Sequence, residues 1–507
     1  MAMLEIKNLS FSYPDSEEKT IDNVNLTLED GSFTVICGQT GSGKTTLLRL
    51  IKREIAPYGR QEGGIYLDGT EIRDLDDRQS VAEIAFVRQN SNVQIVCDKV
   101  WHELAFALES LGADSSFIRR RCSEVSAFLG ISHLFDRSTD SLSGGEQQLV
   151  CLGAALVTNP RLLILDEPLS RLDPVAAMAL VNGLRRINSE LGIGVLMCEH
   201  RLENLVDIAD RLVMLHEGRV IYNGDCAGVG KLEFCPVEKN LPASMRLFRH
   251  IGNGDKCPLN TAEGKRAFAD AQVKNKIEDK LIGGKAVLEA KELYFGYAKG
   301  KVVLKNTSLK LVDGAHYALV GGNGMGKSTL LYVLSGAYKP LKGKIKYNGK
   351  IIMLPQNPMN VFDSNTVGEE IGDCGLIKEL GLDAVKDRHP LDISGGQQQL
   401  TAFGKALALK PDILFLDEPE KGLDGENKEV MGSLIKRFTG SGGTVLTVSH
   451  DVDFCARWAD RLGMFFGGEI VSSGGRYEFF AKNICYTTSV CKMLGGRALT
   501  VEEVLGQ

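Results

Sequence analysis

The sequence predicts an α/β protein built from two domains of the same kind. The chain has 507 residues, which is long for a single hydrophobic core and suits two domains of ordinary size. Four motifs occur twice in the same order, and short apolar strand patterns alternate with helical patterns around them. Several of these strand patterns are apolar at consecutive positions, which is typical of parallel sheets that are covered on both faces.

The internal repeat divides the chain into two domains and a connecting segment. We expect the first domain over residues 1–225, a tail and linker over residues 226–286, and the second domain over residues 287–507. The connecting segment mixes Pro, Gly, Asn and charged residues without a strong period, although residues 262–280 are compatible with one or two helices.

Each repeat begins with a glycine-rich loop of the pattern GxxxxGK[ST], which follows an apolar strand pattern and opens into a helical one. Such a loop surrounds phosphates with backbone N–H groups and a helix N-terminus, places its lysine on the β- and γ-phosphates and offers its last hydroxyl to Mg²⁺. The predicted nucleotide-binding residues here are Gly38, Gln39, Thr40, Gly41, Ser42, Gly43, Lys44, Thr45 and Thr46, and Gly321, Gly322, Asn323, Gly324, Met325, Gly326, Lys327, Ser328 and Thr329.

Each repeat also contains an apolar strand pattern that ends in Asp-Glu-Pro. The aspartates, Asp166 and Asp417, stand at the strand tips and are predicted to hold Mg²⁺ through water. The glutamates that follow them, Glu167 and Glu418, are predicted to polarise the attacking water. Because adjacent side chains diverge at a strand end, the two carboxylates can take separate roles.

A Ser-Gly-Gly motif precedes each Asp-Glu pair, and its hydroxyl and bare backbone suit phosphate oxygens at a helix start. Its residues are Ser143, Gly144 and Gly145, and Ser394, Gly395 and Gly396. The distance from this serine to the following aspartate is 23 residues in both repeats. The second repeat is shorter by 16 residues between its loop lysine and Gln356, and by another 16 between that glutamine and its Ser-Gly-Gly motif.

These motifs, in this order, resemble the nucleotide-binding domain of ABC-type ATPases over roughly residues 3–225 and 287–475. The resemblance implies two P-loop ATPase domains, each with a parallel-rich core sheet, an antiparallel β subdomain and a helical subdomain. It also implies that the domains pair head to tail. Lys44 would then share one ATP with Ser394, and Lys327 would share another with Ser143.

The resemblance assigns roles to residues outside the glycine-rich loops. Tyr13 and Tyr297 would stack on adenine, whereas Gln89 and Gln356 would sense Mg²⁺ and relay its presence to a partner. His200 and His450 would contact the γ-phosphate. The catalytic set is therefore expected to comprise Glu167, Glu418, His200, His450, Gln89 and Gln356. The metal set is expected to comprise Thr45, Ser328, Gln89, Gln356, Asp166 and Asp417, with ATP and Mg²⁺ as the ligands.

The segments SRLD and KGLD, which end in Asp173 and Asp424, resemble the D-loop of the family. Arg171 in the first and Glu420 with Lys421 in the second depart from the usual pattern.

A finer resemblance starts at the first glutamine. The segment QNSNVQ, from Gln89 to Gln94, and the residues 98–112 after it are similar to the QNPDNQ segment and following helix of energy-coupling-factor transporters, which import vitamins or metal ions. In that family the helix meets a transmembrane scaffold subunit. The resemblance implies a peripheral ATPase at the cytoplasmic face of the membrane. Its partners would be that scaffold and a small substrate-binding membrane subunit.

The helical pattern of residues 98–111 places Val100, Leu104, Leu108 and Leu111 on one stripe, with Trp101 beside it. Packing on the helix's own domain accounts for part of this stripe. Exposed apolar side chains beyond it, Trp101 above all, would suit a partner's helix.

Two other tandem ABC proteins remain as alternatives. The tandem ATPases of monosaccharide importers have a similar length, but one of their two sites is often degenerate, whereas both lysines and both glutamates are present here. The soluble translation-factor type generally carries a long, highly charged helical linker, which residues 226–286 resemble poorly.

Composition narrows the partners and the compartment. The net charge is -6, so no basic excess favours a nucleic-acid partner, and none is expected. The twelve cysteines contain no CxxC pair, which fits a reducing cytosol. The sequence has neither a signal-peptide pattern nor a run of about 18 apolar residues, so another chain is expected to span the membrane.

Overall fold

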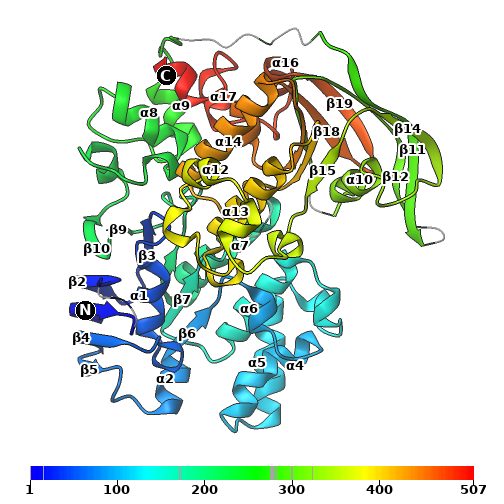
Figure 1. The fold of residues 1–507 in the computed structure, drawn as a ribbon. Coiled ribbons are helices and arrows are strands. Elements are labelled where there is room, and N and C mark those ends of the chain that lie inside the picture. Colours follow the sequence, from blue (N-terminus) through cyan, green and yellow to red (C-terminus); the bar gives the residue numbers. More distant parts are fainter. Residues whose placement is uncertain are drawn as a thin grey trace. The chain divides into compact units, whose positions relative to one another are not determined.

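The computed structural model describes residues 2–14, 16, 18–170, 172, 174–274, 279, 283–298, 301–322 and 324–506. Contacts divide the chain into two compact units. Unit 1 comprises Met1–Met245 with Asp255–Asn260, and unit 2 comprises Arg246–Gly254 with Thr261–Gln507. Both units combine helices with a mostly parallel sheet and an antiparallel sheet (Figure 1), which confirms the predicted α/β class.

A six-stranded sheet forms the centre of unit 1. Its order is β10-β9-β3-β8-β7-β6, and all neighbours are parallel except β9 and β10. The strands β3, β7 and β8 are buried at every position, as expected for uninterrupted apolar runs. The strands are β3 (Phe33–Gly38), β6 (Ile84–Val87), β7 (Leu162–Asp166), β8 (Gly194–Cys198), β9 (Arg211–His216) and β10 (Arg219–Gly224).

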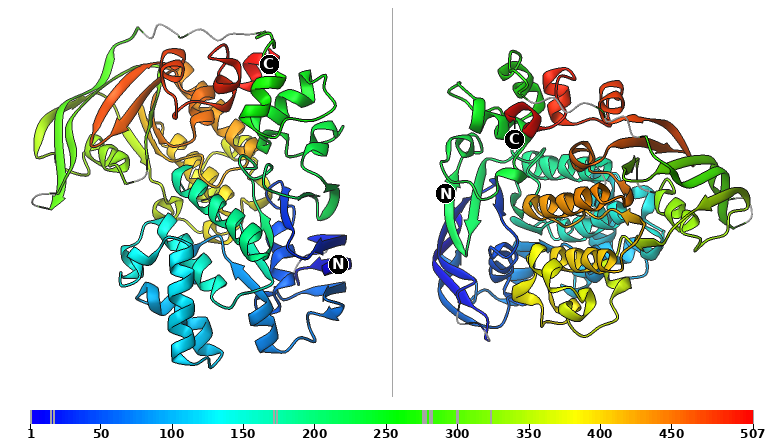
Figure 2. Two further views of the ribbon diagram at one scale, coloured as in Figure 1. Left: turned by 180° about the vertical axis from the view of Figure 1, so that it is seen from behind. Right: turned by 45° about the horizontal axis from the view of Figure 1, so that its top comes forward.

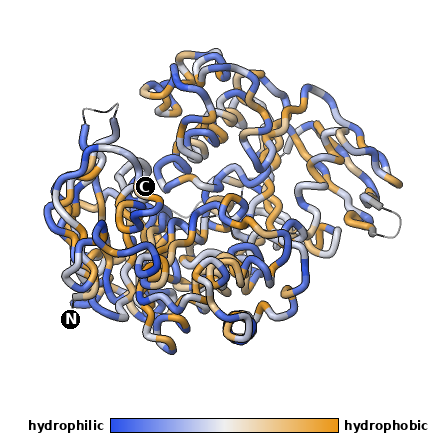
Figure 3. Tube along the Cα trace, turned by 90° about the horizontal axis from the view of Figure 1, so that it is seen from below, coloured by the Kyte–Doolittle hydropathy of each residue, from blue (hydrophilic) through white to orange (hydrophobic). Residues whose placement is uncertain are grey.

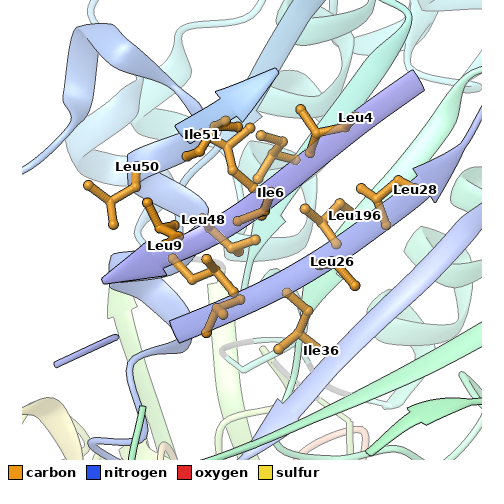
Figure 4. Close-up of a cluster of buried hydrophobic side chains, with 14 of the residues drawn as sticks. Leu4, Ile6, Leu9, Leu26, Leu28, Ile36, Leu48, Leu50, Ile51 and Leu196 are labelled. Carbon is orange, nitrogen blue, oxygen red and sulfur yellow. The ribbon is translucent and has the colours of Figure 1, made fainter. Parts of the chain in front are cut away.

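An antiparallel sheet lies beside the central sheet of unit 1, in the order β2-β1-β4-β5. Its strands are β1 (Ala2–Ser12), β2 (Ile21–Glu29), β4 (Arg60–Leu67) and β5 (Thr70–Glu71). Helix α1 (Lys44–Ile51) contributes Leu48, Leu50 and Ile51 to one apolar core with side chains of β1, β2 and β8 (Figure 4). Both sheets therefore hold the helix that follows the first glycine-rich loop.

The helices of unit 1 gather mainly between Gln89 and Asp166, in the segment coloured cyan in Figure 2. Asp114 and Ser143 cap two of them, and Ser143 forms a capping box with Glu146. The α-helices after α1 are α2 (Asp77–Glu83), α3 (Ser91–Gln94), α4 (Val100–Ser110), α5 (Ser115–Phe128), α6 (Gly144–Leu156) and α7 (Pro174–Leu191).

Unit 2 repeats this plan. Its central sheet has the order β15-β16-β17-β13-β18-β19, in which only β18 and β19 are antiparallel, and its second sheet has the order β12-β11-β14. The strands are β11 (Ala286–Ala298), β12 (Lys301–Val312), β13 (His316–Val320), β14 (Lys342–Tyr347), β15 (Ile351–Leu354), β16 (Ile413–Asp417), β17 (Thr444–Ser449), β18 (Arg461–Phe466) and β19 (Glu469–Gly475).

From the glycine-rich loop to the Asp-Glu motif, the described α-helices of unit 2 are counterparts of α1, α4, α5 and α6, and further helices extend to the C-terminal part of the chain. These helices are α10 (Lys327–Leu334), α11 (Val367–Ile371), α12 (Cys374–Glu379), α13 (Gly395–Ala408), α14 (Gly425–Gly440), α15 (Val452–Trp458), α16 (Arg476–Lys482), α17 (Ser489–Leu494) and α18 (Val501–Leu505).

The two missing 16-residue stretches correspond to specific elements. Between the helix that begins at the loop lysine and the glutamine, unit 1 has β4, β5, α2 and β6, whereas the described part of unit 2 has β14 and β15 as its only strands and α-helices. Between the glutamine and the Ser-Gly-Gly motif, α4 and α5 of unit 1 have 11 and 14 residues, and their counterparts α11 and α12 have 5 and 6. The shorter unit therefore keeps the central sheet and loses peripheral structure.

The connecting segment packs against the C-terminal residues of the chain. It contains α8 (Ala243–Ile251) and α9 (Thr261–Ala267), and α9 starts one residue before the stretch 262–280 that was predicted to be helical. The Nη2 atom of Arg246 lies 2.6 Å from Oε1 of Glu502, and the guanidinium of Arg497 donates to the carbonyl oxygens of Ala269 and Ala271. The end of the chain is thus part of a helical cluster that the sequence patterns did not predict.

Within the described residues, no helix is both long enough and apolar enough to cross a membrane. Figure 3 shows hydrophobic residues interspersed with hydrophilic ones along the trace.

A buried histidine makes the stability of unit 2 depend on pH. His316 begins β13, and its ring lies between the carbonyl oxygen of Trp458 (2.9 Å) and the hydroxyl of Thr447 (2.7 Å). Burial lowers the pKa of His316 from 6.5 to about 4, although Trp458 and Asp460 act in the opposite direction.

We predict that acid destabilises unit 2 through His316. Between pH 6.5 and pH 4 the unfolded chain binds a proton that the folded ring excludes, so the free energy of unfolding falls as the pH falls, by about 3 kcal/mol across this window. His316→Gln removes this contribution but keeps hydrogen-bonding groups. Both proteins, with and without His316→Gln, also carry Trp101→Phe. Trp458 is then their only tryptophan, so its fluorescence reports the unfolding of unit 2. Parallel pH dependences with and without His316 would contradict the prediction.

Candidate functional site

The first glycine-rich loop connects the buried strand β3 to helix α1. Gly41 and Gly43 have φ angles of 83° and 96°, which a residue with a Cβ atom rarely adopts. Lys44 is buried, and its Nζ atom donates to the carbonyl oxygens of Gly38 and Gln39, both at 2.9 Å. The loop therefore wraps around the lysine ammonium at the N-terminus of a helix, which is the arrangement that binds a polyphosphate.

The second loop has the same geometry between β13 and α10. Gly324 and Gly326 have φ angles of 71° and 100°, and Nζ of Lys327 donates to the carbonyl oxygens of Gly321 and Gly322 at 2.9 Å each. Asn323, which the sequence places in this loop, lies outside the described residues. The repeated geometry indicates two phosphate sites of one design.

A hydroxyl and a buried carboxylate meet at the base of each loop. In unit 1, Thr45 Oγ1 donates to Asp166 Oδ1 at 2.8 Å. Burial raises the pKa of Asp166, and hydrogen bonds from Cys198 and Thr45 partly oppose this effect. In unit 2, burial raises the pKa of Asp417 to about 6 despite its hydrogen bond with Ser328.

These oxygens fit a magnesium ion. Oδ1 of Asp417 is buried and has no hydrogen-bond partner among the described residues, so one oxygen at the base of the second loop has unused capacity. Hydroxyl and carboxylate oxygens are the ligands that Mg²⁺ prefers. A bound cation would also stabilise the ionised carboxylate that burial otherwise disfavours.

Glu167, directly after Asp166, is the centre of a three-residue cluster in unit 1. Its backbone has a φ of 45°, an uncommon value for a residue with a side chain. Its Oε1 atom lies 2.8 Å from Nε2 of His200, and its Oε2 atom accepts a hydrogen bond of 2.8 Å from Nε2 of Gln89. The structure thus brings together three residues that are far apart in the sequence.

Glu418 occupies the same position in unit 2, with a φ of 49°. Gln356 donates to its Oε2 atom at 2.5 Å, and Nδ1 of His450 lies 3.3 Å from its Oε1 atom. Lys421 adds an ion pair of 3.3 Å. Burial raises the pKa of Glu418, but His450, Lys421 and Gln356 outweigh it and hold the pKa at about 2. The carboxylate is therefore ionised at neutral pH.

The tyrosines predicted to contact adenine are also placed alike. The hydroxyl of Tyr13 lies 3.1 Å from Oγ1 of Thr46, and that of Tyr297 lies 2.9 Å from Oγ1 of Thr329. Each ring packs edge-on against a phenylalanine two residues earlier and leaves part of its surface exposed. Both tyrosines thus lie next to the start of the helix that follows a glycine-rich loop.

The Ser-Gly-Gly motifs begin helices α6 and α13. Ser143 and Ser394 are the N-caps, and their hydroxyls accept hydrogen bonds from the backbone N–H groups of Glu146 (3.4 Å) and Gln397 (3.3 Å). Gly144 and Gly395 have open space where a Cβ atom would lie. Each motif therefore presents a capped helix N-terminus that a small anionic group can approach.

The sequence patterns missed several ionisable side chains that are buried or partly buried in the two units. In the sequence, Lys421 stands out only as a departure from the family pattern. Glu199 directly follows the apolar strand β8, and this position was the only signal for it. Glu103 and Glu370 interrupt apolar helical stripes, which is a usable signal for a buried carboxylate with a structural partner.

Comparison with known proteins identifies the chain. The family described as "ABC transporter" matches residues 21–170 and 304–421, which together make up more than half of the sequence. The chain belongs to the ABC transporter family. Domains of this family bind ATP, generally with Mg²⁺, and hydrolyse it, so this ABC protein is an ATPase.

Relatives of this ABC protein match nearly its whole length. A Bacillus cereus protein named "Putative ABC transporter ATP-binding protein" is 37% identical over 543 residues, which cover 99% of this chain and 98% of the relative. A protein of the same name from Methanosarcina mazei is 30% identical and covers 94% of this chain. Among solved structures, the crystal structure of the archaeal ribosome recycling factor aABCE1 with ribosomal stalk protein aP1 aligns over 94% of this chain and 91% of its own, with a TM-score of 0.64 and 22% identity. That likeness concerns the fold.

The glycine geometry gives a prediction for the first loop. A Cβ atom on Gly43 would lie 2.6 Å from the carbonyl oxygen of Thr20, whereas one on Gly41 would meet nothing within 4 Å. Both alanine variants carry the strain of a left-handed backbone, roughly 1–2 kcal/mol. Gly43→Ala adds a clash with the backbone, so it should lower the melting temperature and the ATP affinity more than Gly41→Ala. If the two variants lowered the melting temperature and the ATP affinity equally, the close contact between Gly43 and Thr20 would not be what requires glycine at position 43.

Proposed function

We propose that this ABC protein is the ATP-hydrolysing subunit of an energy-coupling-factor-type importer of vitamins or metal ions, bound at the cytoplasmic face of the membrane. The observation that carries the proposal is a group of exposed apolar side chains just after Gln89. Val93, Val96, Trp101 and Phe106 are 63%, 67%, 41% and 48% exposed. We call these four residues the α3–α4 patch.

The α3–α4 patch is separate from the core of unit 1. Val100, Leu104 and Leu108 of the predicted stripe are buried in that unit, so they account for the packing of helix α4. Trp101 and Phe106 lie outside this buried set. Exposed apolar side chains suit contact with a helix of a protein partner, and the sequence resemblance implies a scaffold subunit at this segment.

A short, firmly held segment joins the patch to the ATP site. Gln94 accepts from the N–H of Arg88 at 2.7 Å and donates to the carbonyl oxygen of Phe86 at 3.2 Å, which fastens the segment to the end of β6. Glu103 accepts from the N–H groups of Val96 and Cys97 at 3.0 and 2.9 Å. At the start of this segment, Gln89 donates a hydrogen bond to Glu167. A movement of Glu167 or Gln89 on nucleotide binding can therefore displace the segment that carries the patch.

The proposed chemistry divides among the residues of each site. Glu167 and Glu418 orient the attacking water, while the loop lysines and the histidines stabilise charge on the phosphates. Mg²⁺ would be held by Thr45, Asp166 and Gln89 in one site and by Ser328, Asp417 and Gln356 in the other, and its charge would neutralise the phosphate oxygens. The proposal keeps the head-to-tail sharing of nucleotides, Lys44 with Ser394 and Lys327 with Ser143, on the strength of the sequence resemblance.

The unequal trimming of the units supports different roles toward the partner. The segment of unit 2 that corresponds to the patch consists of the short helical turn Pro358–Val361 and the 5-residue helix α11. We propose that the two units meet different faces of an asymmetric membrane partner. Competition of both units for one identical partner helix would contradict this part of the proposal.

Purification from membranes tests the function. We predict that the chain, isolated from its own cells in mild detergent, carries a scaffold-like membrane protein and a small substrate-binding membrane protein. The variant Trp101→Ser/Phe106→Ser should lose both, because it removes apolar contact area, while the ATPase rate of the purified chain stays unchanged. Mass spectrometry identifies the partners and the cargo.

Tyr58→Ser is the matched control, since Tyr58 is 88% exposed on the same unit and lies outside the patch. This variant should retain the membrane partners. Co-purification of ribosomal proteins would favour the translation-factor type instead, and a sugar-permease pair would favour the monosaccharide type. Retention of the scaffold by the patch variant would show that the patch is not the docking surface.

A further inference from the structure

Each ATP site contains a buried carboxyl group that the proposed chemistry does not use. Glu199 directly follows β8 in unit 1 and is 2% exposed, and Glu420 lies in the loop after β16 in unit 2 and is 3% exposed. Carboxyl groups are rarely buried to this extent without a specific partner.

The two carboxyl groups come from positions that do not correspond. Strand register pairs Asp166 with Cys198 and Asp417 with Val448, so the structural counterpart of Glu199 is Ser449. Glu420 stands three residues after Asp417, so its counterpart in unit 1 is Leu169. Each unit therefore has one of these two carboxyl groups. In unit 1 it follows the strand that precedes the histidine, and in unit 2 it lies in the loop after the strand that carries the Asp-Glu pair.

Despite this exchange, both carboxyl groups connect the same two loops. Oε1 of Glu199 accepts a hydrogen bond of 2.7 Å from the backbone N–H of Leu169. Oε1 of Glu420 accepts one of 2.5 Å from the hydroxyl of Ser449. In each unit the bond runs between the loop that follows the glutamate of the Asp-Glu pair and the residue that precedes the histidine.

We infer that Glu199 and Glu420 are positioning residues that hold the water-orienting glutamate of each site against its histidine, an inference that rests on the proposed function. If the two side chains only filled space in the core, there would be no reason for the carboxyl group to occur at different positions in the two units. A bridge between the loops gives a reason, because either end of the bridge can carry the carboxyl group. We call each of these contacts the carboxyl bridge.

The bridge has a physical purpose at this place. Glu167 and Glu418 both have positive φ angles, and a strained backbone persists only where its surroundings hold it. Burial raises the pKa of Glu199 to about 8, and the charge of Glu167 acts in the same direction, so Glu199 is largely protonated at neutral pH. The bridge in unit 1 thus fastens the loops without a second full negative charge beside Glu167.

The test removes and then reverses both bridges in the full chain. Glu199→Ser/Glu420→Leu deletes them, because each new residue is the one that the other unit has at that position. Addition of Leu169→Glu and Ser449→Glu rebuilds each bridge from the opposite loop. We predict that deletion lowers kcat by on the order of tenfold with unchanged KM for ATP, and that the reversed bridges restore kcat.

A conservative variant and a separate control distinguish the possible failures. Glu199→Gln/Glu420→Gln keeps the accepting oxygens and should retain kcat; a loss equal to that of the deletion would overturn the positioning role. A wild-type kcat in the deletion variant would overturn the inference. So would a reversed variant that has the wild-type melting temperature but a kcat as low as that of the deletion variant. Wild-type turnover by Glu167→Gln/Glu418→Gln would instead overturn the water-orienting role that the proposed function gives to these two glutamates.

Discussion

Both ATP sites depend on the backbone turn at the end of one buried strand. The strand places an aspartate at its tip, and the next residue, Glu167 or Glu418, turns through a positive φ and donates its N–H to the neighbouring strand, to Cys198 or Val448, at 3.1 or 2.8 Å. This turn separates the side chains of two adjacent acids. One carboxylate faces the hydroxyl of the glycine-rich loop, and the other meets a glutamine and a histidine.

The surrounding fold holds this turn in place. Parallel strands end at the same edge of a sheet, so residues that follow β6, β7 and β8 come together although they are far apart in the chain. Helix α1 is held between two sheets, which fixes the glycine-rich loop relative to the strand tips. Unit 2 has lost peripheral elements yet keeps each of these relations, which indicates that the sheet and the loop are the essential part of the design.

The sequence was sufficient to predict which residues the structure brings together at each glycine-rich loop and strand end. Lys44, Glu167 and Gln89 could be predicted because glycine pattern, strand end and repeat spacing locate them. Glu199 and Glu420 could not be predicted as a pair, because their relation appears only in the register between strands. The packing of the C-terminal residues against the connecting segment was also out of reach, since short amphipathic helices do not encode their partners.

The most direct measurement is the ATP stoichiometry of Glu167→Gln/Glu418→Gln by titration calorimetry with Mg²⁺, together with its hydrolysis rate. We predict two ATP molecules bound per chain and almost no turnover, because the loops are intact and only the carboxylates proposed to orient water are lost. Addition of Lys44→Ala should leave one bound ATP. A single bound ATP before that change, or turnover at the wild-type rate, would contradict the claim that the chain contains two complete sites.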